Sequence, residues 1–250
     1  MVDASSDLKA AMRLAGETSY PNEACGLVVS VGKKSRIFEC KNHAEDKRNQ
    51  FRIAAEDFAR LSDMGEVVGV WHTHCEESEN PSDADRAACE SSELTWYILA
   101  VRKVEDQTFT FSDILVLTPS GFEMDYLGRP YIFGVFDCYS LIVDYYRREF
   151  DIVLGNYPHI DNWANLGHNF FAESYEKEGF IRLIDQAPTA GDLFLIQSGA
   201  TVPNHVAIYL GDEIIMHQTH GRLSRRDIYG GYWKKHTTHH LRRREFCDAL

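Results

Sequence analysis

Residues 70–86 read VWHTHCEESENPSDADR and follow a short apolar run at residues 67–69. The apolar residues predict a buried strand that ends on His72 and His74. Residues two apart on a strand point to the same face, so both imidazoles can reach one ion. Asp85 falls in the first turn of the helix that follows, where the chain can fold back toward the end of the strand.

These residues support two interpretations. Two histidines, one aspartate and a water make an open, four-coordinate zinc site of the catalytic kind. Proton transfer at such a site still needs a base, and Glu23, at the entrance to an otherwise apolar strand, is the candidate. Alternatively, Ser82 and Asp85 form the S-x-x-D pattern of a helix capping box, and the histidines are ordinary residues at the end of a strand.

Helices and strands are interleaved on both sides of this stretch. The segments SSDLKAAMRLAGE and SDADRAACESSE predict helices, and FRIAAEDFARLSDMG predicts a strand followed by a helix that ends at Gly65. Strands are predicted for ACGLVVSVG, RIFECKN, VVGVWHTH, TWYILAVRK and TFTFSDILVLT. This order predicts an α/β domain over residues 1–120.

The stretch TPSGFEMDYLGRP carries Pro, Ser and Gly without periodicity and predicts a domain boundary. Beyond it, DCYSLIVDYYRREF predicts a helix capped by Asp137, GNYPHIDNWANLGHNF a polar loop, and ESYEKEGF a second helix. AGDLFLIQ, HVAIYLG and EIIMHQT predict an antiparallel sheet with a turn at Gly211 and Asp212. The arginine-rich LRRREF is interpreted as a solvated tail. Residues 123–250 are therefore expected to form an α+β domain.

Cys138 lies at the start of the first helix of this second domain. A cysteine in that place is usually a small core residue. It becomes a nucleophile when the helix N-terminus and an imidazole lower the pKa of its thiol below the usual ~8.5. Folding the hairpin brings His205 and His217 near one another, as a base and the group that orients it. His168 and His220 are competing candidates.

Composition limits the classes of function. The chain has 250 residues, is 44% hydrophobic and 26% charged, and carries a net charge of −12. This charge argues against binding to nucleic acid or to anionic membranes. No apolar run approaches the ~20 residues of a spanning helix, so membrane insertion is not expected, and the N-terminus does not resemble a signal peptide. Six scattered cysteines suit a reducing cytoplasm.

The complete pattern in the first half is more specific than its parts. H-x-H, followed by S-x-x-D and preceded by the glutamate of E-A-C-G-L, resembles the JAMM (MPN+) metalloprotease family over residues 1–120. The resemblance implies that His72, His74 and Asp85 bind Zn²⁺. It also implies that Glu23 is the general base and that Ser82 stabilises the oxyanion. Cys75 stands where many members of that family have proline.

The segments RPYIFGVFDCYSL, AGDLFLI and NHVAIYLGDEIIMH resemble the NlpC/P60 cysteine peptidases, which have a papain-like α+β fold. The resemblance covers residues 123–250 and implies a catalytic Cys138, His205 and His217, with Tyr131 near the oxyanion. Tyr139 and Ser140 replace the Ser-Gly of the family and alter the pocket beside the nucleophile. Relatives in this family hydrolyse peptide bonds of the peptidoglycan stem.

The two domains in one chain resemble the tail tip assembly family of lambda-like siphophages. This implies a bifunctional peptidase with phage tail tip proteins as partners and peptidoglycan stem peptides as a second substrate class. It would act in the host cytoplasm during assembly or at the virion tail tip. Two alternatives remain: an assembly scaffold with one or both sites inactive, and a host peptidase for cell-wall recycling or deconjugation.

Overall fold

The computed structural model describes residues 6–32, 34–106, 108–155, 164, 166 and 168–247. The chain divides into two compact units, Met1–Glu123 and Met124–Leu250. Most of the polar loop predicted between residues 155 and 170 lies outside the described residues. Within the described part of the chain, every helix is too short or too polar to cross a membrane.

The first unit is a mixed sheet with three helices. Its elements are α1 (Ser6–Ser19), β1 (Cys25–Val31), β2 (Lys34–Cys40), α2 (Ala55–Ser62), β3 (Glu66–Cys75), α3 (Asp83–Ser92), β4 (Thr95–Glu105), β5 (Thr108–Phe111) and β6 (Leu115–Leu117). The strand order is β2-β1-β3-β4-β5, and β6 also pairs with β4. Only β3 and β4 run parallel, since α3 forms the crossover between them; the other pairs are antiparallel.

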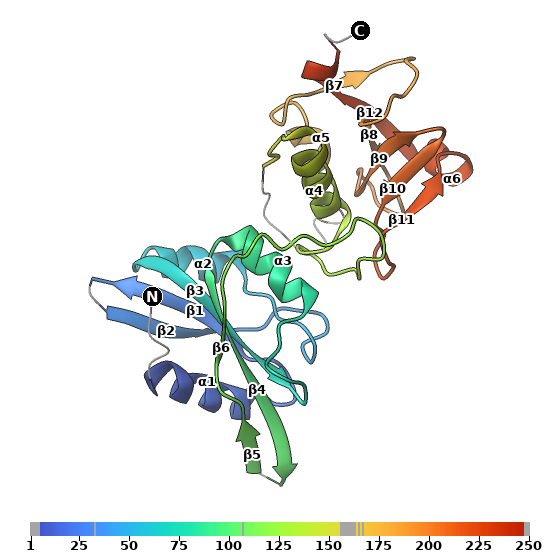
Figure 1. The fold of residues 1–250 in the computed structure, drawn as a ribbon. Helices are drawn as coiled ribbons and strands as arrows, with labels where there is room; N and C mark the ends of the chain where they lie inside the picture. Colours follow the sequence, from blue (N-terminus) through green and yellow to red (C-terminus); the bar gives the residue numbers. More distant parts are fainter. Residues whose placement is uncertain are drawn as a thin grey trace. The chain divides into compact units, whose positions relative to one another are not determined.

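The sheet of the first unit is covered on both faces, with α1 on one side and α2 and α3 on the other (Figure 1). Neighbouring residues of β1 pack on opposite faces, as the period of a strand requires. Val28 belongs to the α1 side, while Leu27 and Val29 pack with Leu61 of α2 and Cys89 of α3. The strand that carries His72 and His74 is therefore an interior strand with a core on each face.

The second unit places helix α4 against an antiparallel sheet. Its elements are α4 (Cys138–Phe150), α5 (Phe170–Ser174), β7 (Phe180–Leu183), β8 (Leu193–Ile196), β9 (His205–Gly211), β10 (Ile214–His217), β11 (Arg225–Ile228), α6 (Gly231–His236), β12 (Thr237–Arg243) and the 3₁₀ turn η1 (Arg244–Phe246). The strand order is β11-β10-β9-β8-β12-β7. Leu141, Ile142 and Tyr146 of α4 pack on one face, with Val206 and Ile208 of β9.

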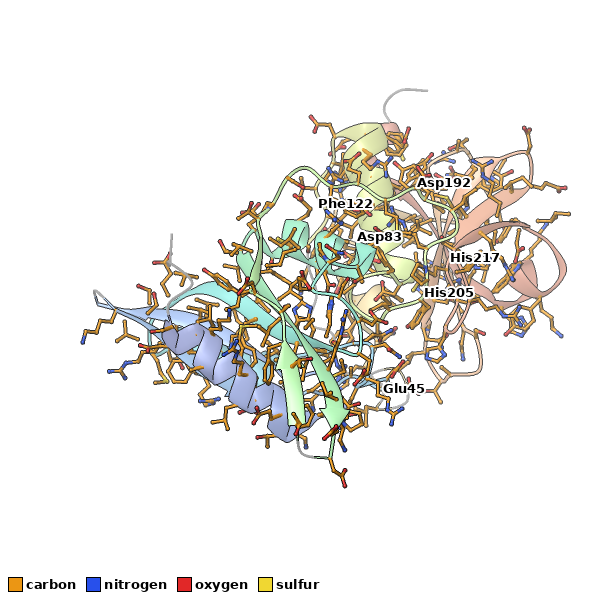
Figure 2. All side chains as sticks on the ribbon, turned by 60° about the horizontal axis from the view of Figure 1, so that its bottom comes forward. Glu45, Asp83, Phe122, Asp192, His205 and His217 are labelled. Atoms are coloured by element: carbon orange, nitrogen blue, oxygen red, sulfur yellow. The ribbon has the colours of Figure 1, made fainter. Side chains whose placement is uncertain are left out.

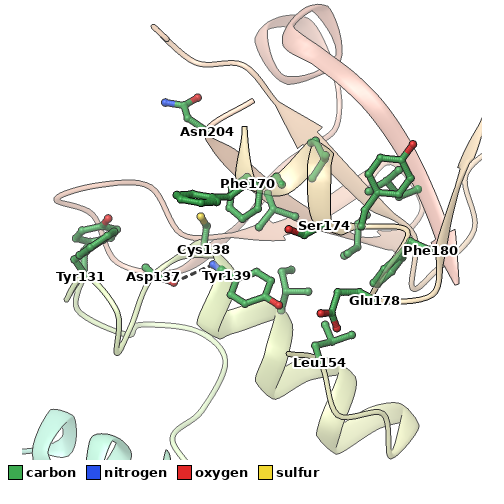
Figure 3. A pocket seen from close by; sticks show the side chains of 18 residues that line it. Tyr131, Asp137, Cys138, Tyr139, Leu154, Phe170, Ser174, Glu178, Phe180 and Asn204 are labelled. Carbon is green, nitrogen blue, oxygen red and sulfur yellow. Dashed lines mark hydrogen bonds between the residues drawn. The ribbon is translucent and has the colours of Figure 1, made fainter. Parts of the chain in front are cut away.

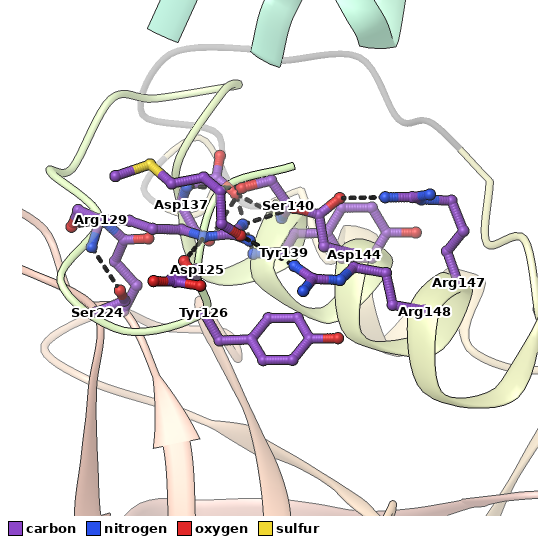
Figure 4. A network of polar contacts seen from close by, with 12 residues as sticks. Asp125, Tyr126, Arg129, Asp137, Tyr139, Ser140, Asp144, Arg147, Arg148 and Ser224 are labelled. Atoms are coloured by element: carbon purple, nitrogen blue, oxygen red, sulfur yellow. Dashed lines mark hydrogen bonds and ion pairs between the residues drawn. The ribbon is translucent and has the colours of Figure 1, made fainter. Parts of the chain in front are cut away.

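Arg129 ties the entry of the second unit to α4 (Figure 4). Its side chain is fully buried and forms an ion pair with Asp144 of α4, at 2.6 Å between Nη1 and Oδ2. The guanidinium also donates to the backbone oxygens of Asp125 and Met124. The Arg129 backbone N–H donates to Ser224 Oγ at 2.9 Å. One residue thus fixes α4, the helix that begins with Cys138, relative to the segment just before β11.

Two predictions about the second unit, the hairpin turn and the second helix, are wrong in detail. The hairpin turns at Asp212 and Glu213, whose φ values of 48° and 58° give the two left-handed residues that a tight hairpin needs, one residue later than predicted. The helix predicted at ESYEKEGF ends at Ser174 and is followed by turns, because Gly179 at φ 76° leads into β7.

The predicted tail LRRREF is a larger error, because residues 241–243 end strand β12 between β7 and β8. Leu241 and Arg242 are buried, and Arg242 donates two hydrogen bonds of 2.8 Å to the carboxylate of Asp192. A run of arginines predicts solvent exposure only when no buried acid pairs with it.

Candidate active sites

The structure brings the ligand atoms of His72, His74 and Asp85 within 4.8 Å of one another, and all three residues are buried. The two Nε2 atoms are 3.0 Å apart, and each lies 3.3 Å from a different oxygen of Asp85. Strand β3 presents the imidazoles side by side, and the first turn of α3 returns the carboxylate to them. Ligand atoms on a tetrahedral zinc ion are separated by about 3.3 Å, so the three side chains fit this metal.

Hydrogen bonds select the imidazole nitrogen that faces the cluster. The backbone oxygen of Ser78 accepts from Nδ1 of His74 at 2.8 Å, which leaves the Nε2 lone pair available as a ligand. The negative charge of the Asp85 carboxylate favours a positive charge beside these two imidazole nitrogens, either a proton or a metal ion. Burial lowers the pKa of His74, but the hydrogen bond and charge of Asp85 outweigh it and raise that pKa to about 9. The cluster thus has the charge balance of a cation site.

Aromatic rings close the inner side of this cluster. Phe51 stacks on His72 with ring centroids 4.5 Å apart, and Trp96 meets the same imidazole edge-on at 5.6 Å. The Nδ1 atom of His72 is buried and has no hydrogen-bond partner among the described residues. Phe51 and Trp96 were not predicted as site residues, because the sequence alone does not distinguish an aromatic residue of a site from one of the core.

Glu23 is buried directly before β1. Burial raises the pKa of its carboxyl to about 9, and the nearby charge of His74 opposes this rise. A positive ion among the three ligands would favour the carboxylate further. The side chain therefore has the environment of a group that exchanges a proton near neutral pH.

Ser82 is the N-cap of α3 and forms a complete capping box with Asp85. Its hydroxyl accepts from the Asp85 backbone N–H at 3.1 Å and donates to Asp85 Oδ2 at 2.7 Å. The Ser82 backbone N–H donates to the same carboxylate oxygen at 2.8 Å. The capping-box interpretation of the S-x-x-D pattern is confirmed, and the same serine orients the carboxylate of the candidate ligand Asp85.

Cys138 is the first residue of α4 and is partly exposed. Asp137 caps this helix by accepting from the backbone N–H groups of Tyr139 and Ser140 at 3.0 and 2.9 Å. Ser140 completes the box by accepting from the Asp137 N–H at 2.8 Å. The helix start is rigid, and the thiol lies at its positive end.

His205 and His217 lie together on β9 and β10, as Figure 2 shows, with 2.9 Å between Nε2 of His205 and Nδ1 of His217. His217 Nε2 lies 3.1 Å from Oδ2 of Asp227 on β11. Because the carboxylate can only accept, His217 donates from Nε2 and accepts at Nδ1. His205 therefore donates from Nε2 and keeps Nδ1 unprotonated, which makes Nδ1 the basic nitrogen.

Asp227 was not among the predicted site residues. It lies on an edge strand whose sequence, RRDI, has no pattern that separates this aspartate from other surface charges. Only the pairing of Ile215 with Asp227 across β10 and β11 brings it to His217. Trp233 of α6 adds a further contact, with its ring edge-on to His217 at 4.5 Å.

The predicted low pKa of the thiol is wrong for this structure. Burial raises the pKa of Cys138 to about 12, and hydrogen bonds from the backbone of Val206, Cys138 and Tyr139 only partly oppose it. Burial also lowers the pKa of His205 to about 3, since the charged imidazolium is equally disfavoured. Both pKa shifts favour the neutral forms, a thiol at Cys138 and an imidazole at His205.

The remaining predicted candidates are Tyr131 and the two competing histidines, His168 and His220. Tyr131 borders the same cavity as Cys138, and its ring meets His220 edge-on with centroids 4.8 Å apart. His168 stacks on Phe170 at 5.3 Å. His205 lies within hydrogen-bonding distance of His217.

Family models match both halves of the chain. Residues 5–112 match the model of prokaryotic homologs of the JAB domain, and residues 128–242 match the NlpC/P60 family. The order of an α/β domain of the JAB kind and an α+β NlpC/P60 domain confirms the predicted fold class.

Two curated relatives span most of the chain. The tail tip assembly protein K of Escherichia phage N15 is 33% identical over 220 residues, which cover 87% of this chain and 86% of that protein. The tail tip assembly protein K of Escherichia phage lambda is 30% identical over 185 residues, which cover 74% of this chain and 86% of that protein.

Solved structures give weaker similarities. An NlpC/P60 family protein from Bacillus cereus matches with a TM-score of 0.33 and 12% identity over 93% of this chain and 66% of that chain. A protein from Desulfitobacterium hafniense matches with a TM-score of 0.32 and 20% identity over 43% of this chain and 78% of that chain. Scores this low carry no argument about the arrangement of the two units.

Proposed function

This chain belongs to the tail tip assembly protein K family, and we propose that it serves there as a peptidase with two separate active sites. The observation that carries the proposal is the hydrogen-bonded series Asp227, His217 and His205, which leaves His205 Nδ1 basic at the start of β9. The next residue of that strand, Val206, borders the same cavity as the helix-capped Cys138. A surface that served only for docking would have no need of this arrangement. We propose residues 1–120 and 123–250 as the two functional domains.

In the first unit we assign His72, His74 and Asp85 as ligands of Zn²⁺. The ion would supply a Lewis acid that polarises the scissile carbonyl. Ser78 and Ser82 orient two of the ligands through their hydrogen bonds to His74 and Asp85. Glu23 would take and return the proton, and the Ser82 hydroxyl would stabilise the developing oxyanion.

In the second unit the Cys138 sulfur would attack a carbonyl carbon while its proton passes to His205 Nδ1. Because the thiol starts neutral, this transfer accompanies the attack. His205 would then protonate the leaving amine as the C–N bond breaks, and water would hydrolyse the thioester by the reverse roles. The backbone N–H of Cys138 and the Tyr131 side chain would stabilise the oxyanion.

The partners we propose are phage tail tip proteins, with peptidoglycan stem peptides as the second substrate class. The proposed place of action is the host cytoplasm during assembly, with the virion tail tip as the alternative. The scaffold alternative retains one supporting observation, namely the high thiol pKa of Cys138, since a neutral thiol is less reactive than a thiolate.

The experiment that tests the proposal compares single-site variants of the full chain on muropeptides and purified tail tip proteins. Cys138→Ser should abolish cleavage of the second-site substrate and leave the zinc content near one per chain. His74→Ala should lose most of the zinc, while Glu23→Gln should keep zinc and lose first-site cleavage. Full zinc retention in His74→Ala, or unchanged cleavage in both Cys138→Ser and Glu23→Gln, contradicts the assignment.

A further inference from the structure

A partly open cavity of about 130 Å³ lies beside Cys138 in the second unit (Figure 3). Cys138 and Val206 form the part of its wall next to the candidate nucleophile. The rest of the wall is mainly aliphatic and aromatic, and includes Leu154, Phe170, Phe171, Tyr175, Phe180 and Leu195. These rings and aliphatic groups come from α5, β7, β8 and the segment after α4.

The charged residues that the structure describes in the wall of this cavity are acidic. Among the described residues that line it, Asp137 and Glu178 are the ionisable carboxyls, and none is lysine, arginine or histidine. Asp137 is committed to the helix cap, and Glu178 accepts from the Gly155 backbone N–H at 2.8 Å. The Tyr139 hydroxyl donates to the Gly155 backbone oxygen at 2.7 Å. An anionic group entering the cavity would therefore lose its hydration and meet negative charge.

The size of the cavity suits one large apolar side chain. A dry protein cavity of about 150 Å³ with similar aliphatic and aromatic walls binds benzene. Burial of a Phe or Leu side chain contributes about 1.5–3 kcal/mol, which corresponds to roughly a 10- to 150-fold preference.

We propose that this cavity is the specificity pocket of the cysteine site and takes a bulky apolar side chain within two residues on the carbonyl side of the scissile bond. This inference rests on the proposed peptidase function of Cys138. It favours an apolar stretch of a protein chain over the carboxylate-rich peptides of the peptidoglycan stem. Tyr139, at the departure from the usual Ser-Gly, forms part of the wall.

An alkylation experiment tests the pocket without requiring turnover. The full chain is treated with iodoacetamide, N-benzyl iodoacetamide and iodoacetate, and modification of Cys138 is followed by peptide mapping. Each rate is divided by the rate for glutathione to remove intrinsic reactivity. The benzyl reagent should react at least about tenfold faster than iodoacetamide, and iodoacetate more slowly. Equal normalised rates, or a preference for iodoacetate, would overturn the inference.

Variants at Ser174 sharpen the result, since this partly buried residue lines the cavity at the end of α5. Ser174→Trp should fill the cavity and bring the normalised rate for the benzyl reagent down to the iodoacetamide rate of the same variant. Ser174→Ala is the matched control and should keep the preference. Should the Trp variant fail to fold, the wild-type comparison of the three reagents still decides the matter.

Blocked peptide anilides extend the test to turnover, with Phe, Leu, Ala, Glu or Lys placed at one of the two positions before the scissile bond. Hydrolysis that favours Phe or Leu over Glu by tenfold or more supports the inference. A preference for Glu overturns it and supports stem peptides as substrates. Absence of hydrolysis of every peptide, with the benzyl preference of Cys138 intact, would contradict the peptidase function while the apolar pocket stands.

Discussion

The two candidate sites are built in opposite ways. His72, His74 and Asp85 come from one strand and the next helix, within a short continuous stretch of sequence. Cys138, His205, His217 and Asp227 come from α4, β9, β10 and β11 and meet only when the whole second unit is folded. At the first site two imidazole nitrogens face a negative carboxylate, whereas at the second two imidazoles and the Asp227 carboxylate form one hydrogen-bonded series.

Because of this difference, different kinds of substitution should disrupt the two candidate sites. The three candidate metal ligands are close together in the sequence, so their arrangement depends on the local connection between β3 and α3. The cysteine site depends on the packing of α4 against the sheet, so a change far from Cys138 can displace it.

Replacement of Arg129 by Met should have the largest effect and should be confined to the second unit. It removes the close ion pair of Asp144 and the donor to the Asp125 backbone oxygen, while the Met124 oxygen keeps its hydrogen bond from Arg148. Asp144 is about one-third exposed and can be hydrated, so the loss of its charged hydrogen-bond partner should cost about 2–3 kcal/mol of unfolding free energy. Denaturant unfolding, followed together with zinc content, should show a destabilised second unit and an unchanged metal site.

Arg147 provides the matched control for this prediction. Its guanidinium lies 3.9 Å from the same Asp144 carboxylate but is about half exposed, at 47% for the side chain. Arg147→Met should change the unfolding free energy by no more than about 0.5 kcal/mol. Equal destabilisation by the two variants would show that burial of Arg129 is not what anchors α4.

Acid should weaken the second unit through Asp192. Burial opposes ionisation of Asp192, but hydrogen bonds from Arg242 and His240 outweigh it and hold its pKa below the usual value. The folded unit therefore binds fewer protons than the unfolded chain. The resulting stability is fully present above the unfolded pKa of about 4 and is lost as the pH falls through the lower folded-state pKa.

Asp192→Asn should consequently lose about 2 kcal/mol of unfolding free energy at pH 7 and show a smaller fall in stability below pH 4. Urea unfolding of the second unit between pH 3 and pH 7 measures both quantities. Parallel curves for wild type and variant would mean that other carboxyls, and not Asp192, govern the acid sensitivity of this unit.

Asp227 should affect the rate of the cysteine site without affecting its assembly. Asp227→Asn removes the negative charge that fixes the His217 tautomer and so weakens His205 as a base. We expect kcat for second-site cleavage to fall about 10- to 100-fold, with KM within about twofold. Asp212→Asn, in the exposed hairpin turn, is the control and should be neutral. A change in KM alone would assign Asp227 to substrate binding.

The contrast between the sites also explains what the sequence could predict. His72, His74, Ser82 and Asp85 lie in one short stretch of sequence, so they could be recognised as one motif. The order of the two domains could be predicted from the order of their helices and strands. Asp227 was missed because its relation to His217 arises from strand pairing. The misassigned LRRREF segment has the same origin, since the partner of Arg242 is Asp192, fifty residues earlier. Long-range pairs leave no local periodicity.

The smallest predicted effect separates the two roles of Ser82. As N-cap, its hydroxyl accepts from the Asp85 N–H, and as a site residue it also holds the Asp85 carboxylate. Replacement of an N-cap serine by alanine costs about 1 kcal/mol, whereas replacement by glycine costs only a few tenths. Ser82→Ala should therefore be less stable than Ser82→Gly in thermal unfolding of the first unit.

Both Ser82 variants lack the hydroxyl, so first-site cleavage should fall equally in the two, by about tenfold or more. Ser82→Thr, which keeps a hydroxyl and a competent cap, should restore most of both properties. If cleavage instead followed stability, with Gly close to wild type and Ala low, Ser82 would act on the site only through the start of α3. The comparison of the three variants thus decides whether the local assembly of the metal site includes a serine that works on the substrate.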